Sequence, residues 1–487
     1  MTGASGNLFL TRVFRFLASR RSQRLALRKQ AAELRQANHD IDQARDVMDL
    51  MVILLTICRR HATEVMAVGQ DREKRRQIRQ EVARVKKAVG PAFTSVGLSP
   101  TTRAIAKATL NEATDFAVAA RALALGIDEA RKKHDPKAYV KRCAKWPYRR
   151  ELSEGDPYPT PSFDLTKMYG GRGFSRRPRR TAATAFDRVD GLALWPSAES
   201  QPLSVIYDTD AGAYLDNALA GRESITILAV LPNGRFEEFR TGGTMTAFFG
   251  MHPWDTVVQN ASIDRGLRKA NAMDVDIVVT PELSSTCDTV TNIRTALAGF
   301  SQGGPRVVIA GGLHVRPGPS EQRNRMSTIY ADPNSPVFEH DKIGEFFADP
   351  WDEDIDRSTT MTIHAGINWS MIPLICADLL DDAVVDAVAD LCPQLVIVPC
   401  MSDKTGDFEM SMGTVIRKTQ ATLMVVNGPQ DWPLFAPPNA RITPPAVVVG
   451  MPLAASWITR VSPPSSSPLP FGVIFCSNLR TVNYIPL

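Results

Sequence analysis

The rhythm of apolar and polar positions changes near residue 200. Before that point, apolar side chains recur at a spacing that keeps one side of a helix apolar, and no strand-like pattern occurs. We therefore predict three or four helices for the first part of the chain, and the same spacing also allows a coiled coil. The apolar stripe on which this rests runs through Leu27, Ala31, Leu34, Ile41, Met48 and Leu55.

Two further helices are predicted in this part of the chain. Residues 71–89 form a short segment with Arg and Lys around most of its surface. Ser99 and Pro100 start another helix, because Ser is a common N-cap and Pro is tolerated at the first helical position. Its apolar positions predict that this helix continues to the neighbourhood of Gly126.

Beyond residue 200, short apolar runs alternate with helical segments. Strands that alternate with helices predict an α/β fold for residues 201–487, and ligands in such folds bind at the carboxyl ends of the strands. The apolar runs fall at 224–231, 276–282, 306–313, 368–376, 394–400 and 422–427, and the helical segments at 255–273, 381–391 and 410–420.

The segment between these two parts is rich in Pro, Gly and Arg. Pro157, Pro159 and Pro161 alternate with other residues, and residues 169–180 combine Gly, Pro and Arg. Such a composition cannot bury a core and is typical of a linker. We therefore divide the chain into a helical domain (1–150), a linker or extended arm (151–200) and an α/β domain (201–487).

The net charge of +5 conceals two parts of opposite sign. Residues 1–150 contain 31 Lys and Arg against 14 Asp and Glu, which is a net charge of +17, and the rest of the chain has a net charge of −12. For the basic half we rank packing on the acidic half and helix-mediated assembly first. Nucleic-acid or protein partners through residues 1–200 stay an alternative, and an anionic membrane ranks third.

The cysteines and the apolar runs indicate a cytoplasmic protein. Seven cysteines without a CxxC pair predict neither a zinc site nor a disulfide framework, which favours a reducing compartment. The longest apolar run, residues 48–58, is much shorter than the ~18 residues that a membrane span needs, so we predict no transmembrane segment.

Three strand ends carry residues that suit thiol chemistry. Glu282 ends the run "DIVVTPE", Lys342 follows a strand expected near residues 337–338, and Cys376 ends "WSMIPLIC". A carboxylate can take the proton of a thiol, and an ammonium can stabilise charge that develops on a substrate oxygen. Taken singly, each residue has a simpler structural explanation. Cysteines at such positions are usually small buried hydrophobes, which is our reading of Cys392, Cys400 and Cys476.

The order of these motifs resembles the carbon–nitrogen hydrolase (nitrilase) superfamily over residues 224–430. The segments "VVTPEL", "VVIAGGL", "RNRMSTIY", "EHDKIGEF", "LICADLL", "LVIVPCMSD" and "LMVVNGP" occur in the order of the family's motifs. The resemblance implies a four-layer α-β-β-α sandwich. It also implies a catalytic triad of Glu282, Lys342 and Cys376, supported by the Ala377 N–H, Asp378 and Asn427.

The resemblance implies an amidase or nitrilase reaction through a thioester, with a small amide or nitrile as substrate and with neither a metal nor an organic cofactor. Family members usually pair, so a homo-oligomer is expected. The position of the family's second glutamate is occupied here by Pro350, with Glu345 and Glu353 as substitutes to be decided between. The acidic cluster around Glu353 is expected to be a solvated lid.

Two alternatives stay open. The same triad would make an amine acyltransferase if an amine replaced water. A family arginine after the cysteine motif is replaced here by Leu379, Leu380, Asp381 and Asp382. This departure leaves room for a catalytically altered sensing or interaction module tethered by the basic half.

Overall fold

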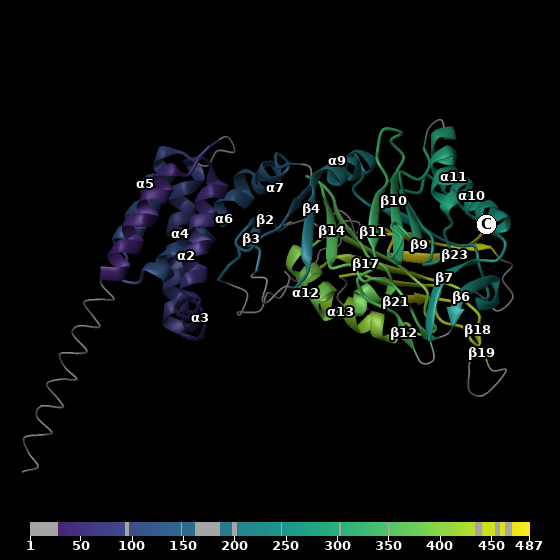
Figure 1. The fold of residues 1–487 in the computed structure, drawn as a ribbon. Coiled ribbons are helices and arrows are strands. Elements are labelled where there is room, and N and C mark those ends of the chain that lie inside the picture. Colours follow the sequence, from purple (N-terminus) through teal and green to yellow (C-terminus); the bar gives the residue numbers. More distant parts are fainter. Residues whose placement is uncertain are drawn as a thin grey trace, which may run out of the picture. The chain divides into compact units, whose positions relative to one another are not determined.

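The computed structural model describes residues 28–92, 97–147, 149–160, 186–196, 202–244, 246–300, 303–348, 351–433, 441–452, 458–462 and 470–487. These residues fall into two compact units (Figure 1). One unit contains the described residues up to Tyr139 together with 186–194, and the other contains 140–160 and the residues from Trp195 onward. The arm predicted at residues 169–180 lies outside the described residues.

The first unit contains mainly helices. Polar caps start four of them: the side chains of Asp46, Asp71, Ser99 and Asp115 each accept hydrogen bonds from backbone N–H groups of the following turn. Such caps satisfy donors that have no partner inside the helix. The helical segments are residues 28–43, α2 (Val47–Arg60), α3 (Ala62–Gln70), α4 (Arg72–Val89), α5 (Pro100–Asn111) and α6 (Phe116–His134).

Two helix boundaries correct the sequence-based expectations. The apolar stripe that was expected to continue to Leu55 is interrupted at residues 44–46, where Asp46 starts α2. The helix that begins at Pro100 ends at Asn111, and Asp115 starts a separate helix, α6. In both cases an Asp side chain competes for backbone N–H groups and starts a new helix within an apolar pattern that continues across the break.

The second unit is built on two large mixed sheets. The strand order is β1-β4-β14-β15-β16-β17-β20-β21 in one and β11-β10-β9-β8-β5-β22-β23 in the other. The eight-stranded sheet consists of β1 (Arg149–Glu151), β4 (Ser204–Asp208), β14 (Thr360–Ala365), β15 (Ser370–Pro373), β16 (Leu395–Cys400), β17 (Thr422–Asn427), β20 (Val447–Gly450) and β21 (Ile458–Val461). The seven-stranded sheet consists of β5 (Thr226–Leu231), β8 (Ile277–Val279), β9 (Val307–Val315), β10 (Arg323–Tyr330), β11 (Phe338–Asp341), β22 (Phe471–Cys476) and β23 (Thr481–Pro486).

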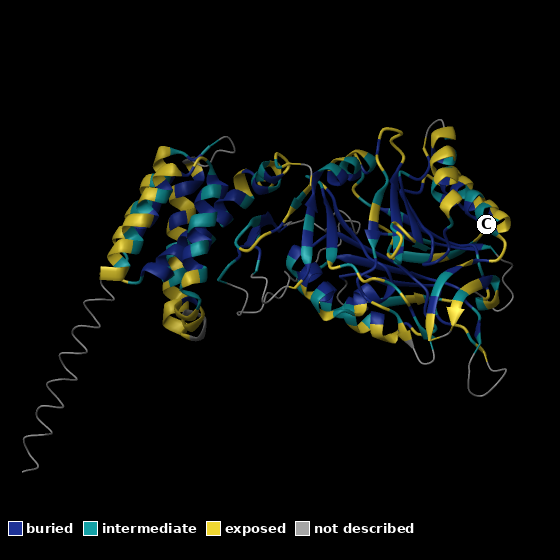
Figure 2. Ribbon diagram, viewed as in Figure 1, coloured by how far each residue is buried: buried dark blue, intermediate teal, exposed yellow. Residues whose placement is uncertain are grey.

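The central strands of both sheets are parallel and buried. β15, β16 and β17 run parallel to one another, as do β5, β8 and β9. Every residue of β16 and β17 is buried, which explains why both read as continuous apolar runs. Figure 2 shows the strands as largely buried and the exposed residues concentrated on the helices. Each strand and helix predicted beyond residue 200 overlaps an observed element, although β8 and β15 are shorter than expected and end before Glu282 and Cys376.

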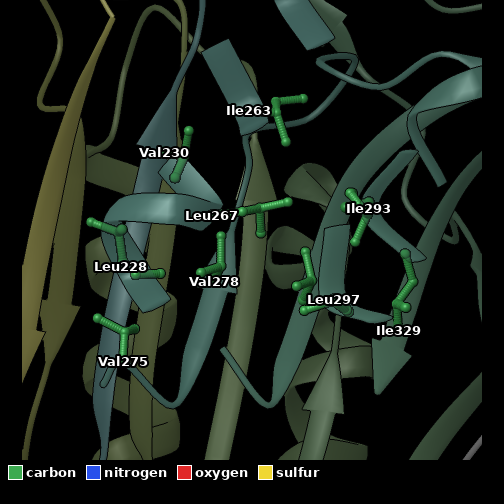
Figure 3. Packing of buried hydrophobic residues seen from close by; sticks show 12 residues of the cluster. Leu228, Val230, Ile263, Leu267, Val275, Val278, Ile293, Leu297 and Ile329 are labelled. Atoms are coloured by element: carbon green, nitrogen blue, oxygen red, sulfur yellow. The ribbon is translucent and has the colours of Figure 1, made fainter. Parts of the chain in front are cut away.

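Helices pack against the sheets through apolar faces. Ile263 and Leu267 of α10 (Thr256–Ala272) and Ile293 of α11 (Cys287–Gly299) share one buried cluster with Val230 and Val278 of the seven-stranded sheet (Figure 3). On the eight-stranded sheet, α13 (Gly406–Thr419) contacts β17 and β20, and α12 (Asp382–Leu391) contacts α13. This packing holds the strand ends in fixed positions.

The prediction that no strand precedes residue 200 is wrong. β1 pairs with β4 at the edge of the eight-stranded sheet, and β2 (Pro157–Pro159) and β3 (Leu192–Leu194) are also extended. Residues 149–151 therefore belong to the α/β unit. A three-residue strand is too short to produce an alternating pattern, which is why the sequence does not reveal it.

No helix of the described residues is both long enough and apolar enough to cross a lipid bilayer.

Candidate active site

Three residues from different strand ends meet in one buried cluster. Glu282 follows β8 and Lys342 follows β11 in the seven-stranded sheet, whereas Cys376 follows β15 in the other sheet. Lys342 Nζ lies 2.8 Å from Glu282 Oε1. The Cys376 thiol donates to the Met401 carbonyl oxygen at 3.9 Å, and the N–H of the same Met401 donates to Glu282 Oε2. Each of the three is at most 2% exposed. The structure thus brings together the carboxylate, ammonium and thiol that the sequence indicated.

The backbone at two of these strand ends is in the left-handed region. Cys376 has a φ of 43° and begins a short 3₁₀ turn, Cys376–Leu380, and Leu283, the residue after Glu282, has a φ of 57°. Such angles are costly for residues other than Gly and occur where a functional side chain must be presented. The Ala377 N–H belongs to the first N–H groups of this turn, which have no carbonyl partner within it.

Glu353 completes the cluster. Its Oε2 lies 2.6 Å from Lys342 Nζ, and its side chain is 1% exposed. The expectation of a solvated acidic lid is therefore wrong for Glu353, although Asp354 and Asp356 of the same cluster are exposed. Of the two candidates for the second glutamate, Glu353 reaches Lys342, whereas Glu345 is exposed and lines the neighbouring cleft. Pro350 lies outside the described residues.

Two residues that were not among the predicted site residues orient the carboxylates. Asn324 Nδ2 donates to Glu282 Oε1 at 2.9 Å and to Glu353 Oε1 at 2.8 Å. His314 Nδ1 accepts from the Met251 N–H, so its Nε2 carries the proton and donates to Glu353 Oε1 at 2.9 Å. Asn324 and His314 face each other across β9 and β10. The Asn in "RNRMSTIY" and the His after "VVIAGGL" were visible in the sequence, but this pairing was not.

The surroundings push the pKa values of the two carboxyl groups apart. Burial raises the pKa of Glu282, and Lys342 only partly offsets this because Glu353 adds a second negative charge. Burial also acts on Glu353, but Lys342 and His314 outweigh it and lower the pKa of Glu353 to about 2. Burial alone would lower the pKa of Lys342, yet the charges of Glu282 and Glu353 hold that pKa well above its usual range. Lys342 is therefore a permanent cation.

Asp378 connects the loop that follows Lys342 to the 3₁₀ turn that begins at Cys376. Its Oδ1 accepts from the N–H groups of Ile343 and Gly344, each at 2.7 Å. Its Oδ2 accepts from the Ile375 N–H and from His340 Nε2, each at 2.8 Å. The residue after Lys342 and the residue before Cys376 are thus bound to the same carboxylate. The aspartate of the "ICAD" motif positions the site and does not contact the Lys342 ammonium.

Asn427 supports a different loop. Its side chain accepts from the Ser402 N–H and donates to the Ser402 carbonyl oxygen, both at 2.9 Å. The adjoining Met401 N–H donates to Glu282 Oε2 at 3.0 Å. Asn427 therefore acts on Glu282 through the 401–402 backbone.

Two glycines allow the close approach of backbone segments at the site. A Cβ atom on Gly312 would lie 2.2 Å from Asn324 Oδ1, and one on Gly344 would lie 2.5 Å from the Ala377 carbonyl carbon. A side chain at either position would displace a group that holds Glu282 or Cys376. This explains the Gly pair of "VVIAGGL" and the Gly of "DKIGEF".

Replacing Asp378 by Ala is expected to lower the free energy of unfolding of the α/β unit by about 3 kcal/mol, because buried N–H groups lose a charged acceptor. The same substitution at Asp386, an exposed residue of α12 paired with Lys418, should change it by less than about 0.5 kcal/mol. Urea unfolding followed by tryptophan fluorescence measures both, since the seven tryptophans lie between residues 146 and 457. Equal effects of the two substitutions would contradict the positioning role.

Two cavities adjoin the cluster. An open cleft of about 600 Å³ is lined by Cys376 and Ala377, and a pocket of about 30 Å³ by Glu282, Lys342 and Glu353. Phe346 lines both cavities. Aromatic and other apolar side chains form the rest of the small pocket: Phe236, Phe248, Met251, Leu283, Trp351, Met401 and Trp432. A small molecule in the cleft can thus approach the thiol, while Glu282, Lys342 and Glu353 are buried.

Among the residues that the structure describes, no group of three or more His, Cys, Asp or Glu is arranged to hold a metal ion.

Comparison with known proteins gives likenesses in solved structures. No model of a protein family matches the chain, and no curated protein matches it. A structure of an amidase variant from Nesterenkonia sp. AN1, with acrylamide added to its active-site cysteine, is 15% identical, with a TM-score of 0.38, and covers 51% of this chain and 92% of its own. A second variant, described as an amidase of the nitrilase superfamily, is 14% identical, with a TM-score of 0.35, and covers 50% and 92%. The solved structures that this chain resembles thus include nitrilase-superfamily amidases.

Proposed function

We propose that the chain is a carbon–nitrogen hydrolase that cleaves a small amide or nitrile through a thioester on Cys376. The observation that carries this proposal is the buried cluster of Glu282, Lys342 and the Cys376 thiol beside an open cleft. We also propose that the two sheets and their helices form the four layers of an α-β-β-α sandwich.

In the proposed reaction Glu282 takes the proton of Cys376, and the thiolate attacks the carbonyl carbon of the amide. The Lys342 ammonium and the Ala377 N–H stabilise the negative oxygen of the tetrahedral intermediate. Protonated Glu282 returns its proton to the leaving nitrogen, and ammonia or an amine departs. Glu282 then activates water, which releases the carboxylic acid from the thioester.

The carboxyl groups of Glu282 and Glu353 have different roles in this scheme. Glu353, with a pKa of about 2, stays ionised beside Lys342 and acts as its fixed counter-ion. Burial raises the pKa of Glu282, which makes it the stronger base of the two. Two titratable groups whose environments separate their pKa values are a common basis for acid–base assignments.

The test is ammonia release from a panel of small amides and nitriles by the full chain. Hydroxylamine added to the reaction should capture the acyl group as a hydroxamate, which reports a thioester intermediate. Efficient capture by alkylamines in preference to water would favour the acyltransferase alternative. Binding of amides without ammonia, hydroxamate or a Cys376 adduct would contradict the enzyme proposal.

The charges that line the cleft lead to a prediction about its substrates. Acidic side chains outnumber basic ones, so amides with a cationic group should be preferred over matched anionic ones by about tenfold or more in kcat/KM. The acidic lining residues are Glu345, Asp352, Asp381, Asp403 and Asp407, and the basic ones are Arg357 and Lys404.

The measurement compares ω-amino, ω-hydroxy and ω-carboxy amides of equal length. The ratio should fall at high salt and in the double variant Asp403→Asn/Asp407→Asn. The variant Asp386→Asn, on the exposed face of α12, is the matched control and should leave the ratio unchanged. A preference for the anionic amide would contradict the prediction.

A further inference from the structure

Cys400 lies next to the proposed nucleophile. The Sγ atoms of Cys376 and Cys400 are 3.3 Å apart, at the ends of the adjacent parallel strands β15 and β16. Both side chains are buried, at 1% and 0% exposure. The proposed hydrolysis uses only one of these thiols, so the second requires its own explanation.

The two thiols differ in access to the cleft and in their surroundings. Cys376 lines the open cleft of about 600 Å³, whereas Cys400 is not among the residues that line it. The Cys376 thiol also contacts the Met401 carbonyl oxygen, and the Met401 N–H donates to Glu282, the proposed acceptor of the thiol proton. Burial and the neighbouring Cys376 raise the pKa of Cys400 well above its usual range, so Cys400 stays a neutral thiol. A small oxidant that enters the cleft therefore reacts at Cys376 first, since the thiolate is the nucleophile.

We propose that Cys400 is a resolving thiol, which converts peroxide-oxidised Cys376 into a reversible Cys376–Cys400 disulfide and so protects the nucleophile from irreversible oxidation. The link itself rests on the geometry of the two sulfur atoms. The accompanying loss and recovery of amide hydrolysis rest on the proposed function.

The chemistry balances with hydrogen peroxide as the oxidant. The Cys376 thiolate attacks one peroxide oxygen, the O–O bond breaks, and the products are a sulfenic acid and, after protonation, water. The Cys400 sulfur then attacks the Cys376 sulfur, the S–O bond breaks, and the departing hydroxide takes the Cys400 proton and leaves as a second water. The sulfurs must approach by about 1.2 Å to reach a bond length of about 2.05 Å. An added dithiol restores both thiols by exchange.

The experiment treats the full chain with a small excess of hydrogen peroxide and maps its peptides without reduction by mass spectrometry. The wild type should yield a peptide pair linked through Cys376 and Cys400, two hydrogens lighter than its parts, which a dithiol separates. Cys400→Ala and Cys400→Ser should instead accumulate sulfinic acid on Cys376, which a dithiol does not reverse. Cys287→Ser removes an exposed thiol and should form the link as the wild type does.

Activity is followed in parallel where an amide is turned over. Dithiol treatment should restore the oxidised wild type to nearly its rate before oxidation. The oxidised Cys400 variants should stay at least about tenfold below their own rates before oxidation. Sulfinic acid on wild-type Cys376, with no linked peptide, would overturn the inference even if both Cys400 variants failed to fold. A linked peptide in a protein that hydrolyses no amide would support the inference while contradicting the proposed function.

Discussion

Replacing Cys376 by Ala is expected to lower the rate of amide hydrolysis by about 10⁴-fold or more, because the neighbouring thiol of Cys400 does not line the cleft. The other residues of the cluster stay in place, so substrate binding should change far less than turnover. Steady-state ammonia release gives the rate, and hydroxamate formation in the presence of hydroxylamine should disappear together with it.

The matched control for this substitution is Cys287→Ala, which removes an exposed thiol at the start of α11. It should retain the wild-type rate within about twofold. Mass spectrometry after incubation with a reactive amide should show one adduct on Cys376 in the wild type and in Cys287→Ala, and none at that position in Cys376→Ala. Undiminished hydrolysis by Cys376→Ala would refute the thioester mechanism.

Replacing Lys342 by Met is expected to abolish activity and to destabilise the α/β unit by about 3–5 kcal/mol at neutral pH, because it leaves Glu282 and Glu353 buried without a cation. The contribution of Glu353 to the pH dependence of stability should also change sign. In the wild type, Glu353 contributes stability fully present above pH 4.5, which is lost as the pH falls through about 2. In Lys342→Met both carboxyl groups have raised pKa values, so that the variant gains stability when acid protonates them.

Urea unfolding at a series of pH values, followed by tryptophan fluorescence, measures both effects. Lys404→Met, which removes an exposed lysine of the cleft, is the control and should change the free energy of unfolding by less than about 0.5 kcal/mol. A Lys342→Met variant that loses stability toward acid as the wild type does would show that the carboxylates do not depend on Lys342.

The α/β fold and the position of the cluster could be predicted because their signals are local. β16 and β17 are buried on both faces and therefore appear as uninterrupted apolar runs. Glu282 and Cys376 each stand at the end of an apolar run, where the carboxyl ends of strands meet, and Lys342 follows the short strand β11. Their flanking motifs, in the family's order, made the three positions specific.

The rest of the site depends on strand pairing and loop paths that the sequence does not encode locally. Asn324 meets His314 only through the register of β9 and β10, which shifts at a β-bulge between Arg325 and Ser327. Glu353 lies in a segment rich in acidic and polar residues. Nothing in the sequence pattern distinguishes its carboxylate, which points into the interior, from the exposed carboxylates beside it. Cys400 was read as a buried hydrophobe, and its burial is confirmed, but its contact with Cys376 follows from the parallel neighbours β15 and β16.

The carboxylates of Asp378 and Glu282 also join the two sheets to each other. Asp378 follows a strand of the eight-stranded sheet and binds N–H groups that follow β11, while Glu282 follows β8 and binds the Met401 N–H that follows β16. These two connections lie beside the cluster formed by the Cys376 thiol, the Glu282 carboxylate and the Lys342 ammonium. Sliding or opening of one sheet relative to the other would break them before it altered the interior of either sheet. The arrangement proposed for the nucleophile therefore exists only while the two sheets are held together, and a half-folded chain would expose Cys376 as an ordinary thiol.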